Sequence, residues 1–115
     1  MYKSQEVLQK NEINGKELEY LLLERKNDRV DFLLLDVREK YEYNEKRIVG
    51  VDYLVPLSDF FNKISEIEEF KSKPIIVKCK LGGRSAQAQQ HMMSMGFEKV
   101  VNLAGGITHY EGETI

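Results

Sequence analysis

Residues 75–86 read Ile75-Ile76-Val77-Lys78-Cys79-Lys80-Leu81-Gly82-Gly83-Arg84-Ser85-Ala86. The segment starts as a short apolar run, continues as a loop with two glycines, and ends where a helical pattern begins. In an open α/β sheet this order places Cys79 at the carboxyl end of a strand, where such folds form their binding crevices. We therefore predict an α/β fold with a functional site around Cys79.

Three other apolar runs, at 32–35, 51–57 and 100–103, have the length of strands that are buried on both faces of a parallel sheet. Helical patterns separate the runs and cover 15–26, 39–46, 58–70 and 85–95. We expect Ser58 to cap the third helical segment, and Gly96 to end the fourth in a positive-φ conformation. The alternation of strands and helices predicts right-handed crossovers between parallel strands.

The composition is that of an ordinary globular domain. Of 115 residues, 42% are hydrophobic and 31% are charged, which fits one domain over residues 1–115. The formal net charge of −2 gives no electrostatic basis for binding nucleic acid or an anionic membrane. The sequence has no apolar stretch of membrane-spanning length and no apolar run at its start that resembles a signal peptide, so we expect a cytoplasmic protein.

Cys79 is the only cysteine, so an internal disulfide is impossible and any sulfur chemistry depends on this residue. With one cysteine, two histidines and no clustered carboxylates, we expect no metal site. A helix that begins after the loop directs its N–H groups at Cys79, and thiols in such positions have pKa values lowered from about 8.5 to ~3.5–7.5. The other interpretation of Cys79 is a structural thiol that ends a core strand.

The loop after the cysteine suits an anionic ligand. Gly82 and Gly83 allow the backbone to turn sharply and bring several N–H groups close to one sulfur atom. Lys80 and Arg84 add positive charge, which suits an anionic sulfur donor such as a thiosulfonate. The guanidinium of Arg84 has the geometry to bind the sulfonate group of such a donor. The hydroxyl of Ser85 either donates to the sulfur or caps the helix.

Residues 79–85 match the C-x-x-G-x-R-S active-site loop of the rhodanese family, with Cys79, Gly82, Arg84 and Ser85 in the matching places. Two further motifs resemble the family in the same order and spacing, namely Asp36-Val37-Arg38-Glu39 and Asn102-Leu103-Ala104-Gly105-Gly106-Ile107. The resemblance covers residues 12–112. It departs from the family at Tyr110, where tryptophan is common, and in Arg47-Ile48-Val49-Gly50-Val51, which represents the usual H-I-P-G-A stretch.

The resemblance implies a three-layer α/β/α domain with a five-stranded parallel sheet. It also implies a sulfurtransferase in which Cys79 takes sulfur from a small anionic donor such as thiosulfate and forms a persulfide. A thiol or protein acceptor then removes the sulfur, which completes a ping-pong cycle without a cofactor. The active-site loop would consist of Lys80, Leu81, Gly82, Gly83, Arg84 and Ser85. Asp36 would organise neighbouring loops, and Arg38 would pair with Asp36 or with the loop after Gly50.

Two alternatives stay open. Cysteine phosphatases and arsenate reductases share this scaffold, but phosphatases place one more residue between cysteine and arginine than the four that separate Cys79 from Arg84. The second alternative is a non-catalytic module that binds a partner or senses oxidants through its thiol. We expect neither His91, which lies far along its helix, nor His109 to act as a base, and we interpret the charges of 39–47 as a solvated helix face.

Overall fold

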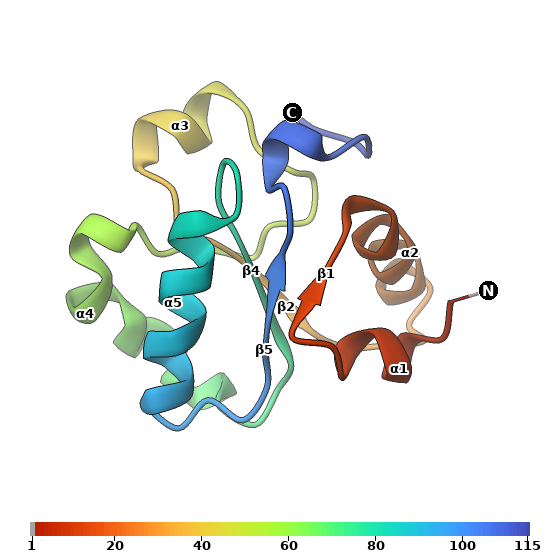
Figure 1. The fold of residues 1–115 in the computed structure, drawn as a ribbon, viewed down its shortest axis with the longest axis horizontal. Coiled ribbons are helices and arrows are strands. Elements are labelled where there is room, and N and C mark those ends of the chain that lie inside the picture. Colours follow the sequence, from red (N-terminus) through yellow and green to blue (C-terminus); the bar gives the residue numbers. More distant parts are fainter. Residues whose placement is uncertain (1) are drawn as a thin grey trace.

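A computed structural model describes residues 2–115 and contains one sheet of five parallel strands (Figure 1). The strands lie in the order β1-β5-β4-β2-β3. Their bounds are Glu12–Ile13 for β1, Leu33–Asp36 for β2, Tyr53–Leu54 for β3, Ile75–Lys78 for β4 and Val100–Leu103 for β5. β4, which leads into Cys79, is therefore the central strand of the sheet.

Helices cover both faces of the sheet, which confirms the predicted three-layer α/β/α fold (Figure 1). α1 (Ser4–Leu8) and α2 (Gly15–Lys26) lie on one face, and α4 (Phe60–Lys63) and α5 (Gly83–Ser94) lie on the other. α3 (Lys40–Glu45) lies near the end of the sheet from which the loop between β4 and α5 emerges. Short 3-10 segments are η1 (Leu57–Asp59), η2 (Ile64–Phe70) and η3 (Ile107–His109).

Alternate residues of the central strands supply two separate cores. Ile75 and Val77 of β4 pack in the core that α4 and α5 cover, whereas Ile76 packs in the core that α1 and α2 cover. Side chains two residues apart along a strand share a face of the sheet. This alternation places Cys79 on the α5 side and Lys78 on the α2 side.

Most predicted elements form at the expected places. The helix predicted over 15–26 is confirmed with those bounds, and a reciprocal capping box between Asn14 and Glu17 starts it. Gly96 follows α5 with a φ of +95°, as predicted. α5 begins at Gly83, two residues before the expected start.

Two predictions of local structure were wrong. Ser58 does not cap a helix, because its hydroxyl donates to Glu39 Oε1 at 2.7 Å. The apolar run 51–57 forms a strand only over Tyr53–Leu54, next to the carboxylate of Asp52, which accepts the N–H of Leu34 at 2.8 Å. The sequence patterns also did not predict α1 or β1, because five and two residues are too few to show a period.

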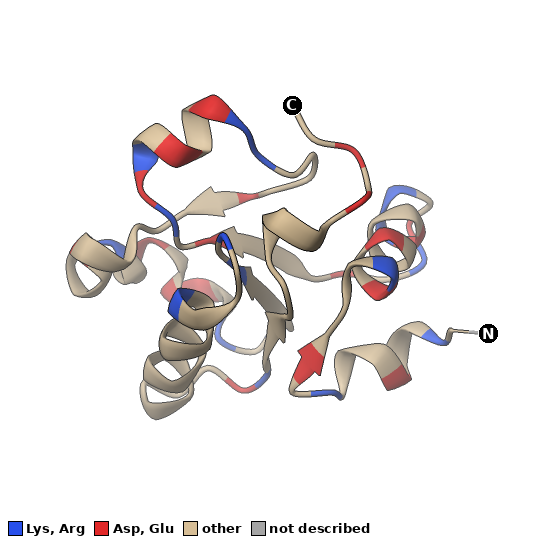
Figure 2. Ribbon diagram, turned by 45° about the horizontal axis from the view of Figure 1, so that its top comes forward, with Lys and Arg blue, Asp and Glu red and all other residues tan. Residues whose placement is uncertain are grey.

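Acidic and basic residues are interspersed along α2 and α3 (Figure 2). Within residues 2–115, none of the helices combines the length and the apolar character needed to cross a bilayer. Over the same residues, no three His, Cys, Asp or Glu side chains gather into a group that could bind a metal ion.

Candidate active site

Cys79 follows β4 directly, and the chain returns through a tight loop to begin α5 at Gly83. Gly82 precedes the helix with a φ of +110°, a conformation that glycine adopts without strain. From this position, its N–H donates to Cys79 Sγ at 3.0 Å. Glycine at position 82 therefore allows the loop to close on the sulfur atom.

Ser85 contacts the sulfur from the first turn of α5. Its Oγ lies 3.3 Å from Cys79 Sγ, 3.2 Å from the Gly82 carbonyl and 2.5 Å from Asn102 Oδ1. The amide nitrogen of Asn102 donates to the same carbonyl at 3.2 Å, which fixes the orientation of the amide group. Of the two roles predicted for Ser85, the structure shows the contact with sulfur, because Gly82 occupies the cap position.

These contacts favour the thiolate form of Cys79. Burial raises the pKa of the thiol, but hydrogen bonds from Ser85, Gly82 and Leu81 outweigh burial and lower the pKa below its usual value. The residue is only 1% exposed. Burial agrees with the structural interpretation of the cysteine, whereas donors aimed at its sulfur agree with the reactive one. The loop therefore encloses one sulfur atom beside the Gly82 N–H and the Ser85 hydroxyl.

The C-terminal turn η3 supports the back of the loop. The N–H groups of Ile107 and Thr108 donate to the carbonyls of Cys79 and Lys80 at 3.0 and 3.1 Å. This approach requires Gly106, whose φ is +53° and where an added Cβ would lie 2.5 Å from both carbonyl oxygens. Because a peptide unit is planar, fixing these carbonyls also fixes the loop N–H groups that follow them.

Arg84 binds Glu42 of α3 with both terminal nitrogens, at 2.7 and 2.9 Å. The hydrogen bond from Arg84 lowers the pKa of Glu42 to about 2, and the same bond raises the pKa of Arg84. Glu42 is only 13% exposed, so its interpretation as part of a solvated face was wrong. Arg84 was predicted to bind the sulfonate of a donor; in this structure a carboxylate already occupies its guanidinium.

A second charged cluster is buried on the opposite face of the sheet. Asp36 accepts hydrogen bonds from the N–H and the guanidinium of Arg38, and from Lys78 Nζ at 3.0 Å. Arg38 also donates to the carbonyl of Lys46 at 2.6 Å, rather than to the loop after Gly50. Asp36 thus joins β2, β4 and the segment around α3. Burial lowers the pKa of Lys78 to about 8, although Asp36 acts in the opposite direction.

The other predicted residues lie around the mouth of the loop or away from it. Lys80 and Leu81 are exposed. Gly83 has no atom within 4 Å of an added Cβ and no positive φ, so the predicted need for glycine holds for Gly82 alone. His91 packs against aromatic rings of α4, and His109 lies in η3. Among the described residues, neither histidine forms a hydrogen bond with the sulfur.

Three residues of the site were not predicted from the sequence: Glu42, Lys78 and Asn102. Lys78 interrupts an otherwise apolar central strand, which is a usable signal for a buried ion pair. Asn102 lies in the C-terminal motif that resembles the family, although the motif alone gave it no role. Nothing in the local pattern distinguishes Glu42 from the charges around it.

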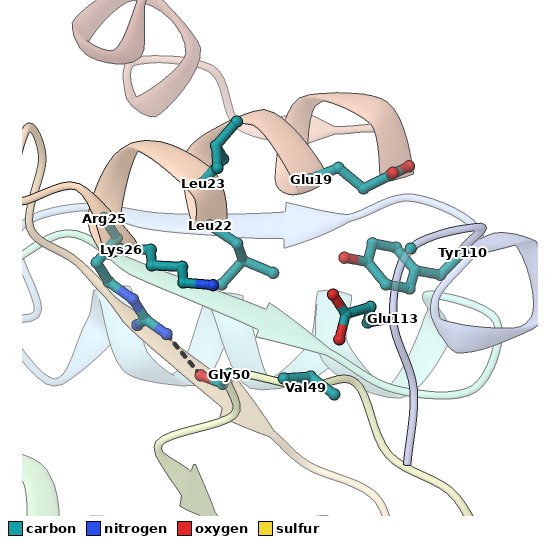
Figure 3. Close-up of a pocket in the computed structure, with 10 residues that line it drawn as sticks. Glu19, Leu22, Leu23, Arg25, Lys26, Val49, Gly50, Tyr110 and Glu113 are labelled. Carbon is teal, nitrogen blue, oxygen red and sulfur yellow. Dashed lines mark hydrogen bonds between the residues drawn. The ribbon is translucent and has the colours of Figure 1, made fainter.

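A separate cavity of about 480 Å³ lies between α2, residues 49–50 and the segment after η3 (Figure 3). Figure 3 shows Tyr110 beside Glu113, with Glu19 of α2 on the same side. Burial raises the pKa of Tyr110 to about 12, and both carboxylates act in the same direction. None of the lining residues belongs to loop 79–85, so this cavity is distinct from the sulfur site.

Comparison with known proteins agrees with this geometry. The family model described as "Rhodanese-like domain" matches residues 17–113. A sulfurtransferase of Allochromatium vinosum is 33% identical over 101 residues, which cover 84% of this chain and 84% of that protein. A tRNA uridine(34) hydroxylase of Cytophaga hutchinsonii is 35% identical over 99 residues, which cover 84% of this chain but only 31% of the hydroxylase. The chain therefore spans about a third of that relative's length.

A solved structure shows the same fold. The rhodanese-like domain of an Anabaena protein superimposes with a TM-score of 0.74 at 28% identity, covering 92% of this chain and 79% of that one. The three motifs quoted from the sequence all lie within the residues that the family model matches.

Proposed function

Since this chain belongs to the rhodanese-like domain family, we propose that it is a sulfurtransferase that carries sulfur as a persulfide on Cys79. The observation that carries this proposal is the arrangement of donors around one atom. The Gly82 N–H and the Ser85 hydroxyl lie 3.0 and 3.3 Å from Cys79 Sγ. Such donors stabilise a thiolate, and the terminal sulfur of a persulfide carries the same charge. The likeness to a sulfurtransferase over most of both chains supports the proposal.

The proposed cycle has two half-reactions. In the first, the Cys79 thiolate attacks the outer sulfur of thiosulfate, a new sulfur–sulfur bond forms, and sulfite leaves with the electron pair of the broken bond. In the second, cyanide or an acceptor thiolate attacks the terminal sulfur of the persulfide, and Cys79 leaves as a thiolate. Sulfur is transferred without a cofactor. Because the cycle needs a free thiolate, a reducing compartment such as the cytoplasm suits it.

The site favours donors that present one sulfur atom at a narrow end. Cys79 is 1% exposed, so a donor reaches Sγ only with a terminal sulfur atom that carries no further group. Lys80 is exposed at the mouth and adds positive charge for an anionic donor, whereas Arg84 is bound to Glu42. Thiosulfate, polysulfides and persulfides of small thiols or proteins all share the required terminal sulfur.

Mass spectrometry of the intact protein tests the proposal. After incubation with thiosulfate, we expect a gain of one sulfur atom that is lost on adding cyanide, with formation of thiocyanate. Cys79→Ser should neither gain sulfur nor form thiocyanate. Equal thiocyanate formation by both proteins would overturn the proposal. Cys79-dependent hydrolysis of p-nitrophenyl phosphate would favour the phosphatase alternative, and sulfenic acid formation without sulfur loading would favour the sensor.

A further inference from the structure

Lys78 is a fully buried lysine at the end of the central strand. Asp36 lies opposite it in the pairing of β2 with β4, and Lys78 Nζ donates to Asp36 Oδ2 at 3.0 Å. A buried ammonium group is very costly without a partner, so this pairing makes the lysine tolerable. The pairing does not explain why a position flanked by apolar strand residues has a charge.

The cluster around Lys78 carries a net charge. The buried guanidinium of Arg38 binds the same carboxylate, with Nη2 at 2.9 Å from Oδ2. In the part of the chain that the structure describes, Asp36 is the one carboxylate that pairs with either cation. Two cations and one carboxylate leave one net positive charge, in an interior where charges interact more strongly than in water.

Cys79 follows Lys78 directly in the chain. We infer that Lys78 supplies the positive charge that stabilises the anionic sulfur of Cys79, first as a thiolate and then as a persulfide. The inference rests on the proposed function and adds a residue on the far face of the sheet to it. Lys78 does not touch the sulfur, and its charge acts through space from the opposite face of the central strand.

The charged groups that face Lys78 agree with this role. Burial lowers the pKa of Lys78 and Arg38 acts in the same direction, whereas Asp36 and a thiolate at Cys79 raise it. A positive charge near a thiol favours its thiolate form, so we expect a protonated Lys78 to lower the pKa of Cys79. With a pKa of about 8, Lys78 is largely protonated at neutral pH.

The other cations near the sulfur are poorer candidates. Three cations occur in residues 78–84, namely Lys78, Lys80 and Arg84. Arg84 is neutralised by the two-point pair with Glu42. Lys80 is exposed, so water and salt screen its charge. Only Lys78 combines burial with incomplete neutralisation.

Two substitutions separate the charge of Lys78 from its hydrogen bond. Lys78→Gln removes the charge but keeps a donor for Asp36, and Lys78→Met removes both. Ile76→Val is the matched control, because Ile76 lies on the same strand and face and carries no charge. The measurement is the pH titration of thiolate ultraviolet absorbance, which needs no reagent to reach the buried thiol. Cys79 is the only cysteine, and Cys79→Ser supplies the blank.

We expect both Lys78 variants to raise the midpoint of thiolate formation by about one pH unit, which is about tenfold less thiolate at a pH below both midpoints. Ile76→Val should leave the midpoint unchanged. An unchanged midpoint in both Lys78 variants overturns the inference, as does a shift in Lys78→Met alone, which would assign the effect to the hydrogen bond. Asp36 keeps its hydrogen bonds from the Arg38 guanidinium in each variant, so its buried carboxylate is not left unpaired; circular dichroism checks the fold.

The titration tests the role of Lys78, and the sulfur-loading assay tests the proposed function, so either proposal can be wrong without the other. If the midpoint shifts but thiosulfate adds no sulfur, the charge of Lys78 acts on Cys79 and the proposed sulfur transfer is wrong. If sulfur loads normally and the midpoint does not shift, the proposed function stands and Lys78 has no part in it.

Discussion

Arg84 and Glu42 form a two-point pair that joins α5 to α3 beside the sulfur loop. Nη1 lies 2.7 Å from Oε1, and Nη2 lies 2.9 Å from Oε2. Paired guanidinium and carboxylate groups of this geometry are strong and directional. The pair therefore positions α3 and also occupies the guanidinium of Arg84.

Glu42→Gln should improve the use of thiosulfate. The neutral amide releases part of the Arg84 guanidinium, which then binds the sulfonate with one charge-assisted hydrogen bond. We expect KM for thiosulfate to fall by about fivefold, equivalent to roughly 1 kcal/mol. Steady-state thiocyanate assays measure it, with Glu45→Gln, an exposed position of α3, as the control. A raised KM would mean that Glu42 instead holds Arg84 in place for the donor.

The pair between Arg84 and Glu42 also predicts that the free energy of unfolding depends on pH in the acidic range. Because Arg84 lowers the pKa of Glu42 from 4.5 to about 2, the carboxylate stabilises the folded state above pH 4.5 and loses this effect as pH falls through 2. The difference in urea midpoint between wild type and Glu42→Gln should therefore be largest above pH 4.5 and shrink toward pH 2. A difference that stays constant over this range would show that the pair does not contribute through charge.

Ser85→Ala should make the thiolate of Cys79 harder to form. The substitution removes a hydroxyl 3.3 Å from the sulfur, and one hydrogen bond to a charged group is worth roughly one pH unit or more. Ser94→Ala is the matched control, since Ser94 ends the same helix and its hydroxyl donates to Gln90. The thiolate absorbance titration measures the midpoint. No change would mean that the Ser85 hydroxyl donates to Asn102 Oδ1 and not to the sulfur.

Gly106→Ala and Gly83→Ala should differ sharply in stability. An added Cβ at Gly106 would lie 2.5 Å from backbone oxygens of the loop, and its φ of +53° is unfavourable for alanine. We expect a loss of about 2 kcal/mol or more and slower sulfur loading. Gly83 starts α5 with open space around it, so alanine there should stay within about 0.5 kcal/mol of wild type. Chemical denaturation compares the two, and equal losses would contradict the close approach of η3.

The sequence predicted the parts of the fold that have a clear period or a local backbone rule. The helix over 15–26 and the central apolar runs have enough residues to show their pattern, and Gly96 ends α5 as helix-end chemistry requires. The contact of Cys79 with the loop was also predictable, because the residues involved are adjacent in sequence. Ser58 failed as a predicted cap because a distant carboxylate, that of Glu39, competes for its hydroxyl.

Contacts between distant segments were beyond the reach of local pattern. Glu42 and Arg84 lie 42 residues apart, and so do Asp36 and Lys78. Each pair forms only after the sheet order brings its two segments together. A run of charges looks the same whether it faces water or a single arginine, so Glu42 could not be separated from its neighbours. For the same reason, the sequence could not show that Glu42 binds the guanidinium of Arg84.

The support of the loop by η3 matters for engineering the donor preference of the proposed sulfur site. Since the N–H groups of Ile107 and Thr108 hold the carbonyls of Cys79 and Lys80, the shape of the loop around the sulfur is set partly by residues outside the loop. A search for variants with new donor preferences that mutates residues 80–85 alone would leave this outer support unchanged. Including residues 104–108 would let the ring of amides widen, as a larger oxyanion would require.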